Sequence, residues 1–183
     1  MDTRKKVLII SASARRNSNS DALADSFMEG AKAAGHDVEK VSLADKKIGF
    51  CKGCFACLKL GKCIIADDAP EITEMIGNAD VIVWATPIYY YEMSGQMKTL
   101  LDRMNSLYPS DYRFRKIYLL TTAAEDESHV PEKAVSGLQG WVDCFEKAEL
   151  AGSLFLGGIN NPGEALERKD ALNDAYEFGK ALE

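Results

Sequence analysis

Four of the five cysteines in this chain of 183 residues lie within one short segment. They are Cys51, Cys54, Cys57 and Cys63, and their spacing is C-x2-C-x2-C-x5-C. Sulfur atoms this close in sequence carry out redox chemistry, bind a metal ion or a metal cluster, or are oxidised to each other. The cysteine segment is therefore the first place in the chain where chemistry is expected.

The overall composition indicates where the protein works. Hydrophobic residues make up 46% of the chain, charged residues 27%, and the net charge is -6. This acidic balance is typical of a solvated surface and argues against a nucleic-acid partner. The first apolar run ends at Ile10 and Ser11 opens a polar stretch, which fits neither a signal peptide nor a membrane span. We therefore expect a cytoplasmic protein with no membrane partner, in which clustered cysteines serve metal or catalytic roles rather than disulfides.

A second unusual stretch, residues 11–20, holds four serines, two asparagines and two arginines directly before a helical pattern. A helix N-terminus presents unpaired backbone N–H groups and the positive end of the helix dipole. Hydroxyl groups add donors, and Arg15 or Arg16 neutralises negative charge. The stretch therefore suits a phosphate monoester, and it lacks the glycine patterns of dinucleotide sites and P-loops. The alternative is a solvated turn that ends in Ser20 as the helix cap.

Aromatic residues gather in a third stretch, residues 86–98, which follows the clearest apolar run of the chain. Pro87 stiffens the backbone where it leaves that run, and Tyr89 and Tyr90 supply flat surface for a planar ring. The alternative is that these tyrosines, Tyr91 above all, pack at the rim of the fold or at a dimer surface.

The elements that position these stretches follow from the hydrophobic pattern. Short apolar or alternating runs predict five strands, at residues 7–10, 37–43, 80–86, 116–122 and 153–156. Helical periodicity or helix-start signals predict five helices, ending at Gly35, beginning at Asp67, and within 94–105, 131–150 and 163–183. Strands that alternate with helices indicate a parallel sheet covered on both faces.

The fold class expected is therefore α/β, a three-layer, doubly wound, five-stranded parallel sheet in the order 2-1-3-4-5. This is the order of flavodoxin, which binds FMN where the strand order reverses. We expect one flavodoxin-like FMN-binding domain over residues 1–183, with a cysteine-rich loop at 44–66. Because parallel strands end at one edge, all three unusual stretches are expected to meet at one site.

Residues 7–20 resemble the start of the NADPH-dependent FMN reductase and iron–sulfur flavoprotein family, a hydrophobic strand followed by G-S-P-R-x-N-G-N-T. Four positions match the pattern and four carry small or polar replacements, such as Ala12 for the first glycine. The resemblance implies phosphate contacts from this loop. The cofactor-binding residues expected here are Ser11, Ser13, Arg15, Ser18, Asn19 and Ser20.

Residues 86–98 resemble the same family's segment [ST]-P-[VI]-Y-x-x-x-[ML]-[ST]-[GA]-x-[ML]-K. The resemblance implies that this segment meets the flavin ring and ribityl chain, and that residues 121–125 form a third flavin loop. The further cofactor-binding residues expected are Pro87, Ile88, Tyr89, Tyr90, Thr122 and Ala123.

The cysteine segment is similar to the compact cysteine motif of iron–sulfur flavoproteins, in which four cysteines hold one [4Fe–4S] cluster. Gly53 and Gly61 allow the tight backbone that such ligation requires. Two alternatives stay open for the four thiols: redox-active or unmetallated cysteines, and a tetrahedral zinc site. The fifth cysteine, Cys144, falls in an apolar helical stripe and is expected in the core.

The resemblance implies an FMN-dependent oxidoreductase that takes hydride from NAD(P)H and passes electrons to flavin, a quinone, or an iron–sulfur cluster and a redox partner. No catalytic side chain is expected, because the flavin carries the chemistry, and His36 and His129 suggest no catalytic role. The family also implies a homodimer or higher homo-oligomer. Two other functions stay open: a non-enzymatic flavodoxin-like electron carrier, and a zinc-binding module built on the four cysteines.

Overall fold

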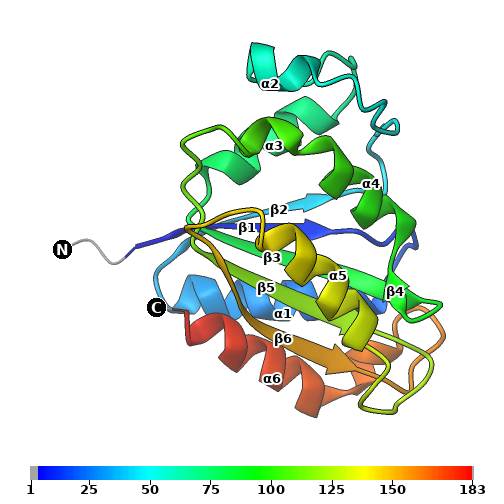
Figure 1. Cartoon of the computed structure of the whole chain (residues 1–183). Helices are drawn as coiled ribbons and strands as arrows, with labels where there is room; N and C mark the ends of the chain where they lie inside the picture. Colours follow the sequence, from blue (N-terminus) through cyan, green and yellow to red (C-terminus); the bar gives the residue numbers. More distant parts are fainter. Residues whose placement is uncertain (1–3, 183) are drawn as a thin grey trace.

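Five parallel strands form the central sheet in the order β2-β1-β3-β5-β6 (Figure 1). The computed structural model describes residues 4–182. The predicted order 2-1-3-4-5 is confirmed, and a short additional strand, β4, pairs antiparallel with the end of β3. The strands are β1 (Lys6–Ser11), β2 (Asp37–Ser42), β3 (Val81–Tyr89), β4 (Glu92–Met93), β5 (Lys116–Thr122) and β6 (Glu149–Leu156).

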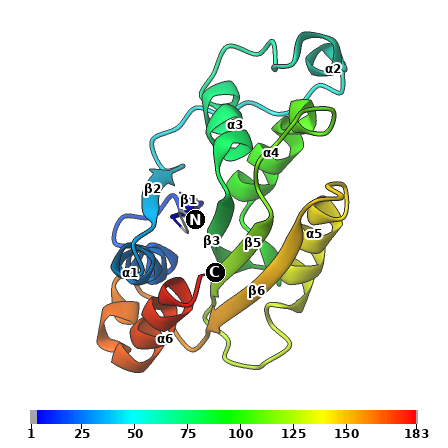
Figure 2. The ribbon, with the colours of Figure 1, turned by 90° about the vertical axis from the view of Figure 1, so that its left-hand side faces the viewer.

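Helices cover both faces of this sheet (Figure 2), with α1 and α6 on one face and α3, α4 and α5 on the other. None of the helices in residues 4–182 is long and apolar enough to cross a membrane. The α-helices are α1 (Asn19–Ala33), α2 (Ala56–Leu60), α3 (Ala69–Asn78), α4 (Gly95–Arg103), α5 (Glu132–Val142) and α6 (Lys169–Lys180). Two short 3₁₀ turns are η1 (Asn105–Leu107) and η2 (Glu164–Glu167).

The strands are buried on both faces, and alternate side chains enter two separate cores. In β1, Val7 and Ile9 join the core under α1 and α6. Leu8 and Ile10 join the core under α3, α4 and α5. The near-continuous apolar runs of the sequence therefore reflect burial from both sides.

The strand β3 continues to Tyr89, although Pro87 was expected to end it. The strand β1 ends opposite Ala85, so Pro87 lies beyond the reach of that neighbour while still pairing in register with Thr122 of β5. A proline is tolerated in a strand where no ladder partner needs its N–H. The extension carries the chain into the hairpin with β4.

The expectation that Cys144 lies in the core is wrong. Helix α5 ends at Val142, and Cys144 is exposed in the turn that follows it. Strand β6 then begins at Glu149, four residues before the predicted start. At the C-terminus, η2 and α6 divide the single helix expected over 163–183, and Glu183 lies outside the described residues.

Two glycines let α1 and α6 pack with their backbones in contact. A Cβ at Gly30 would lie 1.9 Å from the Tyr176 carbonyl oxygen. A Cβ at Gly179 would lie 2.1 Å from the Phe27 carbonyl oxygen. Both distances are far below van der Waals contact, so the helices would have to separate to accept any side chain here. This packing fixes the position of α1 on the sheet.

We expect Gly179→Ala to destabilise the protein by about 2–3 kcal/mol, because the added methyl group forces α1 away from α6. Gly140→Ala is the matched control, since a Cβ at Gly140 in α5 meets no atom within 4 Å. Removing a helical glycine there stabilises by up to about 1 kcal/mol. Urea unfolding measures both, and equal stability of Gly179→Ala and wild type would contradict the described packing.

Candidate functional site

The first turn of α1 is lined with buried polar groups. Ser18 caps the helix, and its Oγ accepts a hydrogen bond from the Asp21 backbone N–H at 3.3 Å. The Oγ atoms of Ser18 and Ser20 are 3.0 Å apart. Ser18, Asn19 and Ser20 are 6%, 8% and 0% exposed, which is unusual for polar residues unless they serve a structural or binding role. A helix N-terminus with such surroundings attracts an anion.

A hollow of about 160 Å³ opens beside this turn, at the carboxyl edge of the sheet. It joins the carboxyl end of β3 to the segments that follow β1, β5 and β6, as expected at the topological switch point of a parallel sheet. Nine of the twelve predicted flavin residues line it: Ser13, Arg15, Ser18, Asn19, Pro87, Ile88, Tyr89, Thr122 and Ala123. The wall is completed by Ala124, Ile159 and Asn160.

The other three predicted residues lie around this wall. Ser11 is the buried last residue of β1, and Ser20 is buried behind Ser18. Tyr90 lines a neighbouring hollow instead. At Ala123 the backbone N–H is already used, because it donates to the Leu156 carbonyl in β6 at 3.1 Å. Ala123 therefore contributes surface to the hollow rather than a free donor.

The loop after β6 is a part of the site that sequence reasoning missed. The Arg15 Nη1 donates to the Asn160 carbonyl oxygen at 2.8 Å, and the Asn19 Nδ2 donates to the Asn161 carbonyl oxygen at 3.0 Å. The Asn19 Oδ1 accepts from the Ala165 N–H at 3.1 Å. These bonds hold the loop against the start of α1. The run Asn-Asn-Pro-Gly at residues 160–163, which three residues separate from the end of a strand, was the available signal.

A second hollow, of about 250 Å³, adjoins the first along Ile88 and lies under the tip of the β3–β4 hairpin. Both residues of that tip are left-handed, with φ of 51° at Tyr90 and 67° at Tyr91. Bulky residues seldom adopt this conformation, and such strain is concentrated at functional sites. Tyr90 is 98% exposed. Tyr91 is instead held within the chain, because its hydroxyl donates to Glu125 Oε2 at 2.7 Å.

The two adjoining hollows fit the parts of a flavin mononucleotide. Buried hydroxyls, a helix N-terminus and Arg15 surround one end, and an apolar and aromatic wall surrounds the other. A larger hollow of about 450 Å³ lies at the opposite, amino edge of the sheet. Its wall carries four carboxylates, which repel phosphate: Asp37, Glu39, Glu71 and Glu74. The carboxyl edge is therefore the candidate site.

The four clustered cysteines line a separate hollow of about 380 Å³. Its other walls include Arg103 and Asn105, at the C-terminal end of α4. The expectation that the cysteine loop meets the two other loops at one site is wrong, because this hollow shares no lining residue with the site beside α1. The loop is long enough to extend past the edge of the sheet and over α3 and α4 (Figure 1). The nine residues of α4, about 13 Å of helix, separate the two regions.

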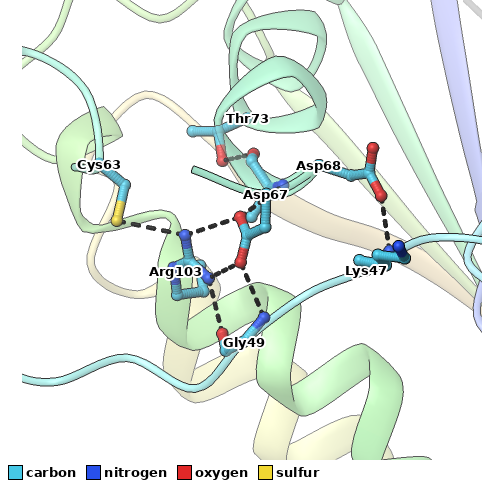
Figure 3. A network of polar contacts seen from close by, with 8 residues as sticks. Lys47, Gly49, Cys63, Asp67, Asp68, Thr73 and Arg103 are labelled. Atoms are coloured by element: carbon cyan, nitrogen blue, oxygen red, sulfur yellow. Dashed lines mark hydrogen bonds and ion pairs between the residues drawn. The ribbon is translucent and has the colours of Figure 1, made fainter. Parts of the chain in front are cut away.

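Arg103 ties the cysteine loop to the body of the protein (Figure 3). Its Nη1 and Nη2 donate to both carboxylate oxygens of Asp67, at 2.7 and 3.0 Å. Nη1 also donates to the Gly49 carbonyl oxygen at 2.6 Å, and Nη2 to Cys63 Sγ at 3.3 Å. The Arg103 side chain is fully buried and that of Asp67 is 10% exposed. One side chain therefore holds the two ends of the cysteine loop together.

Comparison with known proteins places this arrangement among flavin enzymes. A family model described as NADPH-dependent FMN reductase matches residues 5–136. An iron-sulfur flavoprotein of Methanosarcina thermophila is 28% identical over 87% of this chain and 84% of its own length. An iron-sulfur flavoprotein of Archaeoglobus fulgidus is 36% identical over 54% of this chain, a match that spans only 45% of that protein.

Among solved structures, an NAD(P)H:quinone oxidoreductase from Methanothermobacter marburgensis superposes with a TM-score of 0.74. The superposition covers 99% of this chain and 100% of that one. At 21% identity the likeness concerns the fold, and it agrees with the flavodoxin-like architecture described above.

The Arg103–Asp67 pair makes the stability of this region depend on pH. Burial acts to raise the pKa of Asp67, but hydrogen bonds from Arg103 and from the backbone of Gly49 and Ala69 outweigh burial and hold it below its ordinary 3.8. A lowered pKa contributes stability that is complete above the ordinary value and is lost as the pH falls through the lowered value.

We therefore expect Asp67→Asn to cost about 3 kcal/mol at pH 7, because it leaves a buried arginine without its counter-charge. The difference from wild type is constant at neutral pH and shrinks as the pH falls below the ordinary value of 3.8, because Asp67 of the unfolded chain then binds a proton that the folded protein accepts only at a lower pH. The control is Asp170→Asn, which makes the same charge change in an exposed ion pair with Arg168. Urea unfolding at several pH values tests this, and a pH-independent difference would contradict it.

Proposed function

The chain belongs to the NADPH-dependent FMN reductase family, and from that premise we propose that it is an oxidoreductase that binds FMN at the start of α1. FMN supplies, when bound, the ability to accept hydride from a reduced nicotinamide and to pass electrons on. The observation that carries the proposal is the juxtaposition of the buried hydroxyls of α1 with the strained tyrosine hairpin. The hydroxyls are suited to a phosphate and the hairpin to an aromatic ring.

The residues that line the first hollow each make a different contribution to binding the phosphate. Ser13 and Ser18 offer hydroxyl donors, and the first backbone N–H groups of α1 add the positive end of the helix dipole. Arg15 contributes a fixed positive charge, and its bond to Asn160 keeps that charge at the wall of the hollow. A phosphate here replaces the water that would otherwise solvate these donors. This site selects for the phosphorylated form of the flavin.

The last residues of β3 and the hairpin tip that follows them orient the ring. Ile88 lines both hollows and presents an apolar surface where they adjoin. Tyr89 is 49% exposed and Tyr90 is 98% exposed, so the hairpin leaves one side of the site open. An open aromatic wall suits a planar substrate that approaches, reacts and leaves, as a nicotinamide and a quinone both do. We assign NAD(P)H as the donor and a small planar molecule or a redox protein as the acceptor.

We further propose that the cysteine loop holds a [4Fe–4S] cluster. All four cysteines line one hollow, whereas no three His, Cys, Asp or Glu side chains in the described part of the chain converge as a single metal ion requires. A four-iron cluster needs four thiolates spread around a larger volume. The relatives from Methanosarcina thermophila and Archaeoglobus fulgidus, both named iron-sulfur flavoproteins, support this reading over zinc.

We propose a cytoplasmic homo-oligomer as the working form. Large apolar side chains are exposed both at the hairpin and along the cysteine loop. They are Phe50, Phe55, Leu58, Leu60, Ile64, Tyr89 and Tyr90. Exposed apolar side chains in such number are typical of surfaces that contact another chain, and the hairpin and the cysteine loop each present such a group.

The decisive experiment for the enzyme is NADPH oxidation by purified, FMN-loaded protein under anaerobic conditions, with a benzoquinone as acceptor. We expect one quinone reduced to its quinol for each NADPH oxidised, because both are two-electron couples. Protein that holds FMN but oxidises no NADPH, while accepting electrons from a separate reductase, would show an electron carrier instead.

Arg15 and Arg16 provide a matched test of the phosphate site, because only Arg15 lines the hollow. We expect Arg15→Met to weaken FMN binding about tenfold, roughly 1.4 kcal/mol, and to weaken riboflavin binding much less. Arg16→Met leaves both affinities unchanged. Quenching of flavin fluorescence measures these affinities, and equal losses for FMN and riboflavin would place the phosphate elsewhere.

A further inference from the structure

Arg103, which contacts the cysteine loop, is unusual because its side chain is buried and both of its Nη atoms are hydrogen-bonded. The residue is 2% exposed, and it lies on the same buried face of α4 as the apolar residues Leu100 and Met97. Four hydrogen bonds leave its two Nη atoms, and one of them reaches Cys63 Sγ. Burial strengthens each of these bonds, since the local dielectric constant is low. The positive charge is therefore held firmly beside one of the four clustered sulfur atoms.

The fifth N–H of this guanidinium has no partner. The Arg103 Nε is buried and without a hydrogen bond to any of residues 4–182. A guanidinium is planar, and Asp67 takes the outer edge formed by both Nη atoms. The second Nη2–H, which points to Cys63, and the Nε–H therefore lie on the same remaining edge. On that edge, the Nη2–H contacts Cys63 Sγ and the neighbouring Nε–H has no acceptor. A buried donor without a partner is rare, so an acceptor is expected beside it.

A second donor comes from the turn that follows α4. The Asn105 Nδ2 lies 3.8 Å from Cys57 Sγ, a weak hydrogen bond from an exposed side chain. Both Arg103 and Asn105 also line the cysteine hollow. The C-terminal end of α4 carries the negative end of its dipole, which opposes further negative charge nearby. Arg103 and Asn105 compensate for it with N–H groups aimed at sulfur.

Resting on the proposed cluster, we infer that Arg103 and Asn105 are positioning residues that set its reduction potential. One-electron reduction adds a negative charge to the centre that the thiolates hold. Donors to the thiolate sulfurs, and a buried positive charge, stabilise the more negative reduced state and raise the potential. The unpaired Nε–H supplies an additional donor on the edge that faces Cys63. Removing these donors therefore lowers the potential.

The test is an anaerobic titration of reconstituted, FMN-loaded protein with dithionite, followed by low-temperature EPR of the reduced cluster. We expect Arg103→Gln to lower the reduction equilibrium constant about tenfold, which is about 59 mV for one electron. Asn105→Ala, a surface change that leaves the core intact, shifts the potential in the same direction by less. The control is Arg113→Gln, which removes the same charge from an exposed pair with Asp80 and leaves the potential unchanged.

Each outcome decides the inference. Potentials equal to wild type in Arg103→Gln, or an equal shift in Arg113→Gln, would overturn it. If Arg103→Gln does not fold or folds without a cluster, Asn105→Ala decides, and an unmoved potential there overturns the inference. A wild-type protein that takes up no iron and sulfide refutes the cluster and the inference together. A loaded wild type with unmoved variants refutes only the inference.

Discussion

The parallel pairing of β1 between β2 and β3 is the constraint on which the proposed flavin site depends. It places the carboxyl ends of neighbouring strands at one edge, and it reverses the direction in which the chain winds at that point. The loops after β1, β3, β5 and β6 then meet around the first turn of α1. Ser94 joins two of them, because its N–H donates to Thr86 Oγ1 and its Oγ donates to the Ala12 carbonyl oxygen. The buried serines, the hairpin and the loop at Asn160 belong to one site because of this topology.

Helix α4 connects this edge to the cysteine loop and also separates the two. It begins at the hairpin and ends at Arg103, so the proposed flavin and cluster regions lie at its opposite ends. Within one chain, the nine residues of α4 separate the two proposed regions. The exposed apolar residues of the cysteine loop place that region at the surface, within reach of another molecule. The buried salt bridge between Arg103 and Asp67 fixes the conformation of the cysteine loop at its two ends.

The sequence allowed the sheet order to be predicted, and most of the residues expected to contact flavin do gather around one hollow, because both results follow from local patterns. Apolar runs flanked by turns mark strands, and a polar stretch before a helix marks an anion site. The position of the cysteine loop was not predictable in this way, since a connection of that length does not have to stay at the edge where it starts. Arg103 was also missed. It sits three residues after Leu100 on the buried face of α4, and nothing local shows that Asp67 is its partner.

The tyrosine hairpin shows the same limit at a smaller scale. Tyr89 and Tyr90 were identified by residue type, but the left-handed backbone at Tyr90 and Tyr91 depends on the β3–β4 pairing. Likewise, Cys144 followed a helical stripe in the sequence, and only the early end of α5 removes it from the core. In both cases the backbone conformation is set by the tertiary structure and not by the local helix or strand propensity of the residues.

The central claim is that FMN occupies the carboxyl edge at the start of α1. Hydrogen–deuterium exchange with and without FMN tests it most directly. If FMN binds there, we expect slower exchange in peptides that cover residues 11–20, 87–91, 122–125 and 157–161, with no change around the acidic hollow at residues 37–39 and 71–79. Protection confined to that acidic edge, or spread evenly over the chain, would contradict it.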